Sequence, residues 1–370
     1  MFYSPSFLSS PIKLIDVVNS KLSNCLLLAL YLLKNHLNIK PDGVYCDKKF
    51  RLKPINPCRN IKTLLKMVRK VIITGATGLL GRAVLEKFKS DSKWETLGLG
   101  FSRAGNELKK VDLTDKQATT KVINDFEPHI IIHCAAQRRP DICENEEEVT
   151  RQMNIEATAT ICDIAKTLGA FVIYISTDYV FDGTKPPYKP SDATNPLNKY
   201  GISKLEGEKV TLEIDHNNVV LRVPVLYGEI ASLDESAVTI LYEKVADNTK
   251  NCLMSHIEQK FPTNTADIAK VLELLCIEKL EDSKKVKGIF QWSGNEKFTK
   301  YEMSLRIGKV FKTSVDHVQA MTKADSVAKR PVDCQLDCST TIEVIGCNPQ
   351  TNFDDGIYKS ISDFNNKSNN

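Results

Sequence analysis

Tyr200 and Lys204 stand four residues apart, after a segment that ends in Ser176 and Thr177. Two residues at this spacing share one face of a helix, so the Lys204 ammonium would lie near the Tyr200 phenol. A nearby positive charge lowers the pKa of a phenol. The phenol could then give a proton to a carbonyl oxygen held by the Thr177 hydroxyl, provided that a second molecule supplies hydride. The three residues predict carbonyl reduction, although a tyrosine and a lysine at this spacing alone carry little information.

A glycine-rich segment, Thr74-Gly75-Ala76-Thr77-Gly78-Leu79-Leu80-Gly81, could hold the hydride donor. It follows a β-branched run and precedes a helical pattern, which is the context that makes such a motif specific. Gly75 would permit a tight turn, Gly78 would let the backbone approach a pyrophosphate, and Gly81 would let the helix pack on the sheet. The first N–H groups of the helix would then face the phosphates. The alternative is a glycine-rich turn that binds nothing.

Phe101, Ser102 and Arg103 end the expected second strand, where proteins that hold the ribose 2′-hydroxyl of NAD carry an acidic residue. A hydroxyl and a guanidinium suit a 2′-phosphate instead, so the sequence favours NADP over NAD. The alternative for Arg103 is an ordinary surface charge. Asp112 and Leu113, after the next strand, could flank the adenine.

The segments around these motifs alternate between short β-branched runs and helical patterns, which is typical of a parallel, doubly wound α/β sheet. Strands are expected at 71–73, 97–101, 129–133, 171–176 and 219–223, with a short third element before 129–133. Helices are expected at 80–88, 154–168, 201–213, 237–246 and 265–278. We therefore expect a Rossmann-type fold with a smaller, substrate-side C-terminal lobe built mainly from about 229–350.

Both ends of the chain depart from this pattern. Residues 1–66 lack the alternation of strands and helices, and their apolar run at 25–33 is about half as long as a bilayer crossing requires. We expect a poorly ordered extension, with a signal peptide or an upstream addition to a protein that starts at Met67 as alternatives. Residues 67–350 form the expected core, and the polar tail at 351–370 is expected to fray.

Composition excludes several classes of protein. A chain of 370 residues that is 42% hydrophobic and 26% charged, with a formal net charge of +4, indicates a soluble globular protein without a nucleic-acid-binding stripe or a membrane span. The eleven cysteines include several in apolar segments, so we expect reduced thiols and a cytoplasmic protein, with a nuclear pool as an alternative. Cys334 and Cys338 lack a second pair at zinc-ligand spacing, so no metal is expected. His129 and His133 flank a core strand and are expected to be structural.

Seven segments together are specific enough to carry a resemblance: 74–84, 133–141, 174–183, 222–228, 235–239, 292–296 and 299–303. From Met67 to about Asn348 the chain resembles the β, or regulatory, subunit of methionine adenosyltransferase. That family is related to the dTDP-4-dehydrorhamnose reductases of the extended short-chain dehydrogenase group. The bacterial reductases share the glycine loop but typically lack the Arg138-Arg139-Pro140-Asp141 loop and the segment at Trp292, which favours the regulatory family.

The resemblance implies a non-catalytic role for the chain. Members of the family bind NADP and associate with the catalytic subunit that makes S-adenosylmethionine from methionine and ATP. The partner is implied by the resemblance alone. The cofactor contacts expected from the motifs and the resemblance are Gly75, Thr77, Gly78, Leu79, Leu80, Gly81, Phe101, Ser102, Arg103, Asp112, Leu113, Cys134, Arg138, Tyr200, Lys204 and Leu226.

A second hypothesis stays open because the catalytic residue types are intact. The chain could be an active NADPH-dependent reductase of a nucleotide-sugar or another carbonyl compound. Thr177 would then polarise the carbonyl group, Tyr200 would act as the acid and Lys204 would lower the pKa of the phenol. In the regulatory hypothesis the same residues hold NADP as a structural or sensing ligand.

Overall fold

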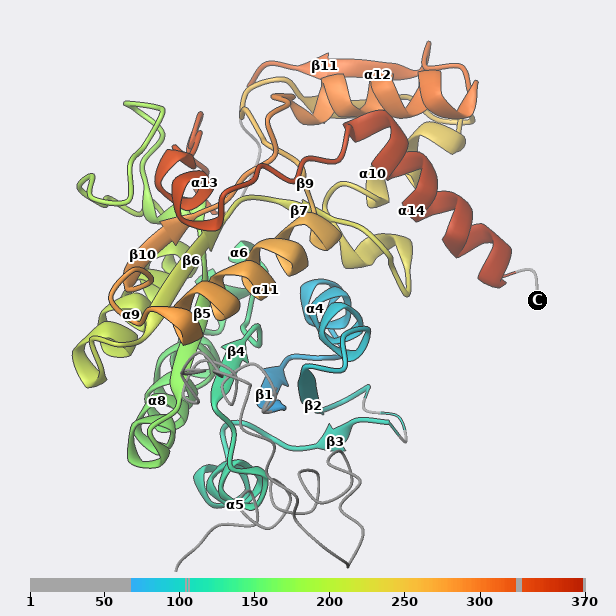
Figure 1. Ribbon diagram of the computed structural model, residues 1–370. Coiled ribbons are helices and arrows are strands. Elements are labelled where there is room, and N and C mark those ends of the chain that lie inside the picture. The colour runs from blue at the N-terminus through green and yellow to red at the C-terminus, as the bar shows by residue number, and fades with distance from the viewer. Residues whose placement is uncertain (1–67, 104, 106, 324–327, 369–370) are drawn as a thin grey trace, which may run out of the picture. The chain divides into compact units, whose positions relative to one another are not determined.

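The computed structural model describes residues 68–103, 105, 107–323 and 328–368 (Figure 1). The expected extension at 1–66, and the alternatives for its origin, lie outside these residues. The described residues belong to one compact unit.

A seven-stranded sheet forms the centre of this unit, and every neighbouring pair of strands in it is parallel. The strand order is β10-β6-β5-β4-β1-β2-β3, so the chain winds outward from β1 in both directions. The predicted doubly wound Rossmann-type fold is confirmed, and ligands of such sheets bind beyond the carboxyl ends of the strands near this reversal. The strands are β1 (Arg69–Thr74), β2 (Trp94–Gly100), β3 (Lys109–Lys110), β4 (Ile130–His133), β5 (Phe171–Thr177), β6 (Val219–Val223) and β10 (Gly288–Gln291).

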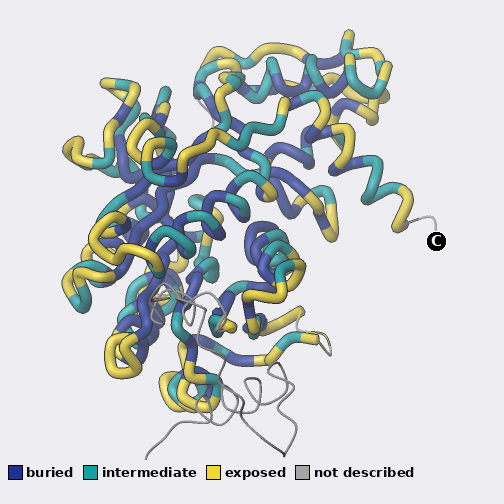
Figure 2. Tube along the Cα trace, in the orientation of Figure 1, coloured by how far each residue is buried: buried dark blue, intermediate teal, exposed yellow. Residues whose placement is uncertain are grey.

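Helices cover both faces of the sheet because successive side chains of a strand point to opposite faces. Val71 and Ile73 of β1 belong to the hydrophobic core on one face, whereas Ile72 belongs to the core on the other. Strands β4, β5 and β6 are buried along their whole length, as the dark trace through the centre of Figure 2 shows. The first face carries α4 (Leu79–Lys89), α11 (Thr265–Glu281) and α13 (Ser339–Ile345), and the second carries α5 (Lys116–Phe126), α8 (Ala157–Leu168) and α9 (Lys199–Ile214).

Local sequence sets several helix boundaries. The Asp115 side chain accepts hydrogen bonds from two backbone N–H groups at the start of α5, and Gly169 ends α8 in the left-handed conformation at φ +68°. The helix predicted from residue 154 begins instead as a π-helical turn, Gln152–Glu156, and α8 proper starts at Ala157. Two short helices precede this turn, α6 (Pro140–Asn145) and α7 (Glu147–Arg151).

A smaller lobe with its own hydrophobic core lies above the sheet in Figure 1. Segment 265–291 returns from this lobe to the large sheet as α11 and β10, so the lobe is assembled from discontinuous pieces of the chain. Its elements are the paired strands β7 (Leu226–Tyr227) and β9 (Thr263–Asn264), the paired strands β8 (Cys252–Ser255) and β11 (Val318–Met321), and the helices α10 (Ile240–Ala246), α12 (Lys300–Phe311) and α14 (Phe353–Ser368).

The prediction of a frayed C-terminal tail is wrong for residues 353–368, which form α14. Phe353, Ile357 and Ile361 recur at helical spacing and are buried in the core of the smaller lobe. The Arg306 guanidinium also donates two hydrogen bonds to the Asp354 carboxylate, at 2.9 and 2.6 Å. The buried apolar residues and the ion pair together hold this largely polar helix against the smaller lobe.

Three observations on the described residues concern membrane spans, metal sites and the state of the cysteines. None of the helices that these residues form is both long and apolar enough to cross a bilayer. The described residues bring no three His, Cys, Asp or Glu side chains together as metal ligands. The cysteines among them are free thiols, and those of Cys334 and Cys338 contact the carbonyl oxygens of Phe181 and Leu336.

Candidate functional site

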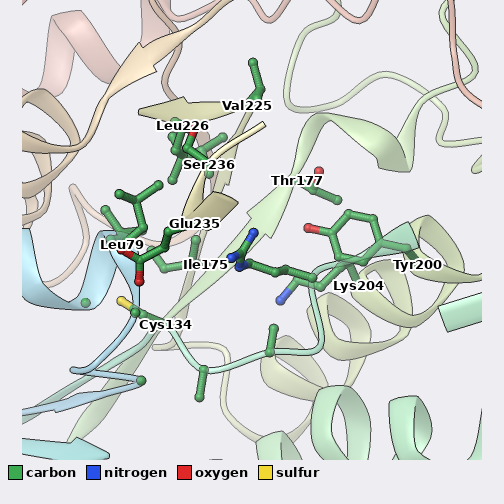
Figure 3. Close-up of a pocket in the computed structure, with 18 of the residues that line it drawn as sticks. Leu79, Cys134, Ile175, Thr177, Tyr200, Lys204, Val225, Leu226, Glu235 and Ser236 are labelled. Carbon is green, nitrogen blue, oxygen red and sulfur yellow. Dashed lines mark hydrogen bonds between the residues drawn. The ribbon is translucent and has the colours of Figure 1, made fainter. Parts of the chain in front are cut away.

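A cavity of about 510 Å³ opens at the carboxyl ends of the sheet strands, between the sheet and the smaller lobe. Such a volume is typical of a site for a cofactor or a small molecule. Every residue that the sequence predicted as a cofactor contact lines this cavity, and so does Thr177. Figure 3 shows Thr177, Tyr200 and Lys204 on one side and Leu79, Cys134 and Glu235 across from them.

The glycine loop has no room for side chains at two of its three glycines. Gly75 has φ +63°, and a Cβ built there would lie 2.8 Å from the Ala135 nitrogen. A Cβ on Gly81 would lie 2.1 Å from the Gly75 carbonyl oxygen. Both obstacles are backbone atoms that cannot move aside, so the close approach of β1, β4 and α4 requires glycine at both positions.

The amino end of α4 faces the cavity without a side-chain cap. Gly78 is its N-cap residue and has no side chain to accept the first helical N–H groups. Leu79, Leu80 and Gly81, which carry these groups, line the cavity. An uncapped helix amino terminus attracts anions through its N–H groups and its dipole. An anionic group such as a diphosphate would suit this loop and helix.

The amino end of α9 presents Tyr200 and Lys204 to the same cavity. The Asn198 side chain caps α9 by accepting a hydrogen bond from the Gly201 N–H at 2.8 Å. A Cβ on Gly201 would lie 2.4 Å from the Tyr179 carbonyl oxygen, so this glycine lets the helix start close behind β5. Thr177 is the last residue of β5, which brings its hydroxyl to the Tyr200 side chain.

Lys204 is buried on the cavity wall, and burial lowers its pKa to about 7. The opposing influence is the negative charge of Glu208, one turn further along α9. The Lys204 ammonium lies 3.9 Å from the centre of the Tyr174 ring, a cation–π contact that partly replaces lost hydration. Gly207 makes room for this ring, because a Cβ there would lie 2.2 Å from the Tyr174 hydroxyl oxygen.

Two of the three predicted catalytic residues, Thr177 and Tyr200, lie close to the buried carboxyl group of Asp178. Burial raises the pKa of the Tyr200 phenol above its usual value, contrary to the predicted lowering by Lys204, and a hydrogen bond with Thr177 works in the opposite direction. The Thr177 hydroxyl also donates to Asp178 Oδ1 at 3.0 Å. Burial raises the pKa of Asp178 to about 6, against the influence of the Lys260 charge. The Tyr200 phenol is thus held in its protonated form, which can donate to a carbonyl oxygen.

Arg103 lies in the turn after β2 and pairs with Glu235, which was not among the predicted cofactor contacts. Its Nη1 atom donates to Glu235 Oε1 at 2.9 Å. Arg82 on α4 donates to both oxygens of the same carboxylate, at 2.9 and 2.5 Å. Burial alone would raise the pKa of Glu235, but hydrogen bonds from Arg82, the Ala231 N–H and Arg103, together with the Arg82 charge, lower it to about 2.

The two histidines named from the sequence are structural, as predicted. His133 is buried, with Nδ1 2.7 Å from the Thr74 hydroxyl and Nε2 3.1 Å from the Thr158 hydroxyl. Burial and the Lys204 charge lower its pKa to about 3, so it stays neutral. His129 accepts a hydrogen bond from the Lys70 N–H at 3.0 Å.

The cavity continues beyond Tyr200 into a region that sequence reasoning missed. Lys260 donates to the Tyr179 hydroxyl at 3.1 Å, and the Tyr179 and Tyr200 rings meet edge to face at 6.0 Å. Arg330 pairs with Asp141 at 3.1 Å. The residues of this region that line the cavity without having been predicted include Tyr179, Glu258, Lys260, Lys300, Met303 and Arg330. Tyr179, Lys300 and Met303 fall in segments that carry the family resemblance, whereas no motif marks Glu258, Lys260 or Arg330.

The parallel sheet, the glycine loop under α4 and the Thr–Tyr–Lys set define the class of protein. It is a Rossmann-fold protein of the short-chain dehydrogenase/reductase kind. Residues 69–366 match the family described as RmlD substrate binding domain.

Curated relatives give a narrower family. The methionine adenosyltransferase 2 subunit beta of Bos taurus is 48% identical over 297 residues, which cover 80% of this chain and 88% of that protein. A dTDP-4-dehydrorhamnose reductase of Aggregatibacter actinomycetemcomitans is 31% identical over 290 residues, 76% of this chain and 94% of that protein. The chain belongs to the family of methionine adenosyltransferase 2 beta subunits, so the resemblance seen in the sequence is confirmed.

Solved structures agree with the observed fold. A dTDP-4-dehydrorhamnose reductase of Bacillus anthracis, crystallised in complex with NADP, superimposes with a TM-score of 0.68 at 25% identity. The match covers 80% of this chain and 99% of the reductase.

Proposed function

We propose that this chain is a non-catalytic regulatory subunit of methionine adenosyltransferase, which binds the catalytic subunit and modulates the formation of S-adenosylmethionine. The observation that carries this proposal is the 48% identity to a protein named as the beta subunit of that enzyme, across 88% of its length. The reductase relative is more distant, at 31% identity, which favours the regulatory role over catalysis.

The proposed ligand is NADP, held in the cavity between the sheet and the smaller lobe. The uncapped amino end of α4 suits the diphosphate, and Arg103 suits a 2′-phosphate. Asp112 and Leu113 would flank the adenine, while Cys134, Arg138 and Leu226 line the path toward Tyr200. Tyr200 and Lys204 would then bind the ribose next to the nicotinamide.

A second function is supported by the arrangement of Thr177, Tyr200 and Lys204 around one cavity. An NADPH-dependent reductase needs a hydroxyl that orients a carbonyl oxygen and a phenol that gives up a proton, and both groups are present here. NADPH would supply hydride when bound. The space beside Tyr179 and Lys260 would take the substrate, a nucleotide-sugar or another carbonyl compound.

The first experiment mixes the full chain with a methionine adenosyltransferase catalytic subunit, with and without NADP. Complex formation is followed by analytical ultracentrifugation, and the rate of S-adenosylmethionine formation is measured in the same samples. A stable complex with altered kinetics supports the regulatory proposal. Tight NADP binding without a complex would contradict it and favour the reductase, for which NADPH oxidation against a panel of carbonyl compounds is the next assay.

A further inference from the structure

Glu235 is a buried carboxylate at which three segments of the cavity wall meet. It lies in the single turn Leu233–Glu235 of the smaller lobe and is 3% exposed. Arg82 reaches it from α4, Arg103 from the turn after β2, and the Ala231 N–H donates to Oε2 at 2.9 Å. Its two oxygens therefore accept four hydrogen bonds, which uses the full acceptor capacity of a carboxylate.

The two arginines that Glu235 holds have different surroundings. Arg82 is anchored further by the Thr77 carbonyl oxygen in the glycine loop, at 2.7 Å, and by the Glu229 carbonyl oxygen, at 3.0 Å. The Arg103 side chain is 52% exposed, and the contact to Glu235 uses one Nη1 donor. A guanidinium has five N–H donors, so most of those on Arg103 remain for a ligand.

We propose that Glu235 is a specificity-determining positioning residue, which holds Arg103 as a ligand for the 2′-phosphate of NADP. The inference rests on the proposed function, because it assumes that a dinucleotide lies in this cavity. A long arginine loses side-chain entropy when it binds a phosphate, and an anchor that fixes the side chain beforehand reduces that loss. Through Arg82, the Glu235 carboxylate also joins the glycine loop to the smaller lobe. Arg103 is therefore held at a fixed place relative to both.

The alternative is that Glu235 only weakens phosphate binding by repulsion between negative charges. The two explanations predict opposite effects for Glu235→Gln. In glutamine an NH₂ group, which cannot accept, replaces one carboxylate oxygen, so the two hydrogen bonds which that oxygen accepts are lost. Arg103 is the most exposed partner and has a single hydrogen bond to Glu235, so it is the one expected to be released. Positioning therefore predicts a loss of preference for NADP, whereas simple repulsion predicts a gain.

Isothermal titration calorimetry of the full chain with NADP and with NAD tests the proposal. The measured quantity is the ratio of the Kd for NAD to the Kd for NADP. We expect Glu235→Gln to lower this ratio by roughly tenfold or more, toward the value of Arg103→Ala, with little change in the Kd for NAD. The double variant should lower the ratio no further than Arg103→Ala alone, since both changes act through one guanidinium. Asp234→Asn is the matched control, because this neighbouring carboxylate pairs with Arg139 at 3.6 Å.

Other outcomes overturn the proposal. If Glu235→Gln leaves the ratio unchanged or raises it, Glu235 does not position Arg103 for the phosphate. The same conclusion follows if the effects of Glu235→Gln and Arg103→Ala on the ratio add in the double variant. Should Glu235→Gln fail to fold by circular dichroism, Glu235→Asp keeps the charge on a shorter arm and should show the same loss. A wild-type chain that binds neither nucleotide contradicts the proposed function itself, whereas one that binds both equally contradicts only the NADP preference and this inference.

Discussion

Arg222 on β6 and Glu208 on α9 form a buried ion pair, and Glu208 lies one helical turn beyond Lys204. Nε of Arg222 lies 2.8 Å from Oε1 of Glu208, and Nη2 lies 2.7 Å from Oε2. The Ser176 hydroxyl donates to the same Oε1 at 2.5 Å. Because Tyr200, Lys204 and Glu208 recur every four residues on one face of α9, the pair fixes the rotation of that helix against β5 and β6.

Removing one partner of this pair should strongly destabilise the protein. Glu208→Gln leaves the Arg222 charge buried without its counter-ion, and we expect a loss of about 3–5 kcal/mol in the free energy of unfolding. Urea denaturation followed by circular dichroism measures it. The double variant Glu208→Leu with Arg222→Met should recover much of that loss, since it removes both charges. A loss below about 1 kcal/mol for Glu208→Gln would contradict this explanation.

Gly81→Ala should damage both the fold and nucleotide binding. The new methyl group would lie 2.1 Å from the Gly75 carbonyl oxygen, so α4 must shift away from the loop. We expect a loss of about 1–3 kcal/mol in stability and a large drop in affinity for NADP, measured by denaturation and calorimetry. Gly105→Ala is the control, because a Cβ there meets no atom within 4 Å. Equal effects of the two changes would count against a close-packing role for Gly81.

Tyr200→Phe separates the two proposed functions. The phenylalanine keeps the ring but cannot give up a proton, so a reductase should lose most of its turnover. A regulatory subunit should keep its effect on S-adenosylmethionine formation nearly unchanged. Both rates are measured on the same preparation, with Tyr358→Phe as a control at an exposed tyrosine on α14. Loss of the regulatory effect in Tyr200→Phe would argue against a purely structural role for NADP.

Lys204 should make stability rise with pH in the absence of nucleotide. Burial lowers its pKa from 10.5 to about 7, so between these values the unfolded chain holds a proton that the folded protein has lost. The free energy of unfolding then increases with pH. The free energy of unfolding of the wild type, relative to that of Lys204→Met, should increase by about 2 kcal/mol from pH 7 to pH 9. Parallel stability curves over this range would show that Lys204 is not desolvated.

The apolar stripe of α14 should be needed for the stability of the smaller lobe. Ile357 is fully buried, and Ile357→Ala is expected to cost about 2–5 kcal/mol, measured by chemical denaturation. Lys359→Ala, on the exposed side of the same helix, removes an ion pair with Asp363 and should cost less than about 1 kcal/mol. If Ile357→Ala and Lys359→Ala have the same free energy of unfolding, α14 does not contribute to the core of the smaller lobe in solution.

Short-range patterns made much of this protein predictable. Gly81 obeys a steric requirement set by nearby backbone, since a Cβ there would lie 2.1 Å from the Gly75 carbonyl oxygen, and the spacing of Tyr200 and Lys204 reflects one helical turn. Strand runs such as 71–73 and 171–176 are apolar because both faces of the sheet are covered. These features of the sequence were sufficient to predict the sheet except for β10, together with the glycine loop and the residues on its side of the cavity.

The tertiary structure alone decided what the smaller lobe contributes. Glu235, Lys260 and Arg330 reach the cavity because separate segments fold back over the sheet, and no local period or spacing marks them in the sequence. The same holds for Phe353, Ile357 and Ile361, whose helix is stabilised by the core beneath it rather than by its own polar composition. The sequence determines requirements that neighbouring residues impose on one another, whereas contacts between distant segments depend on how the whole chain packs.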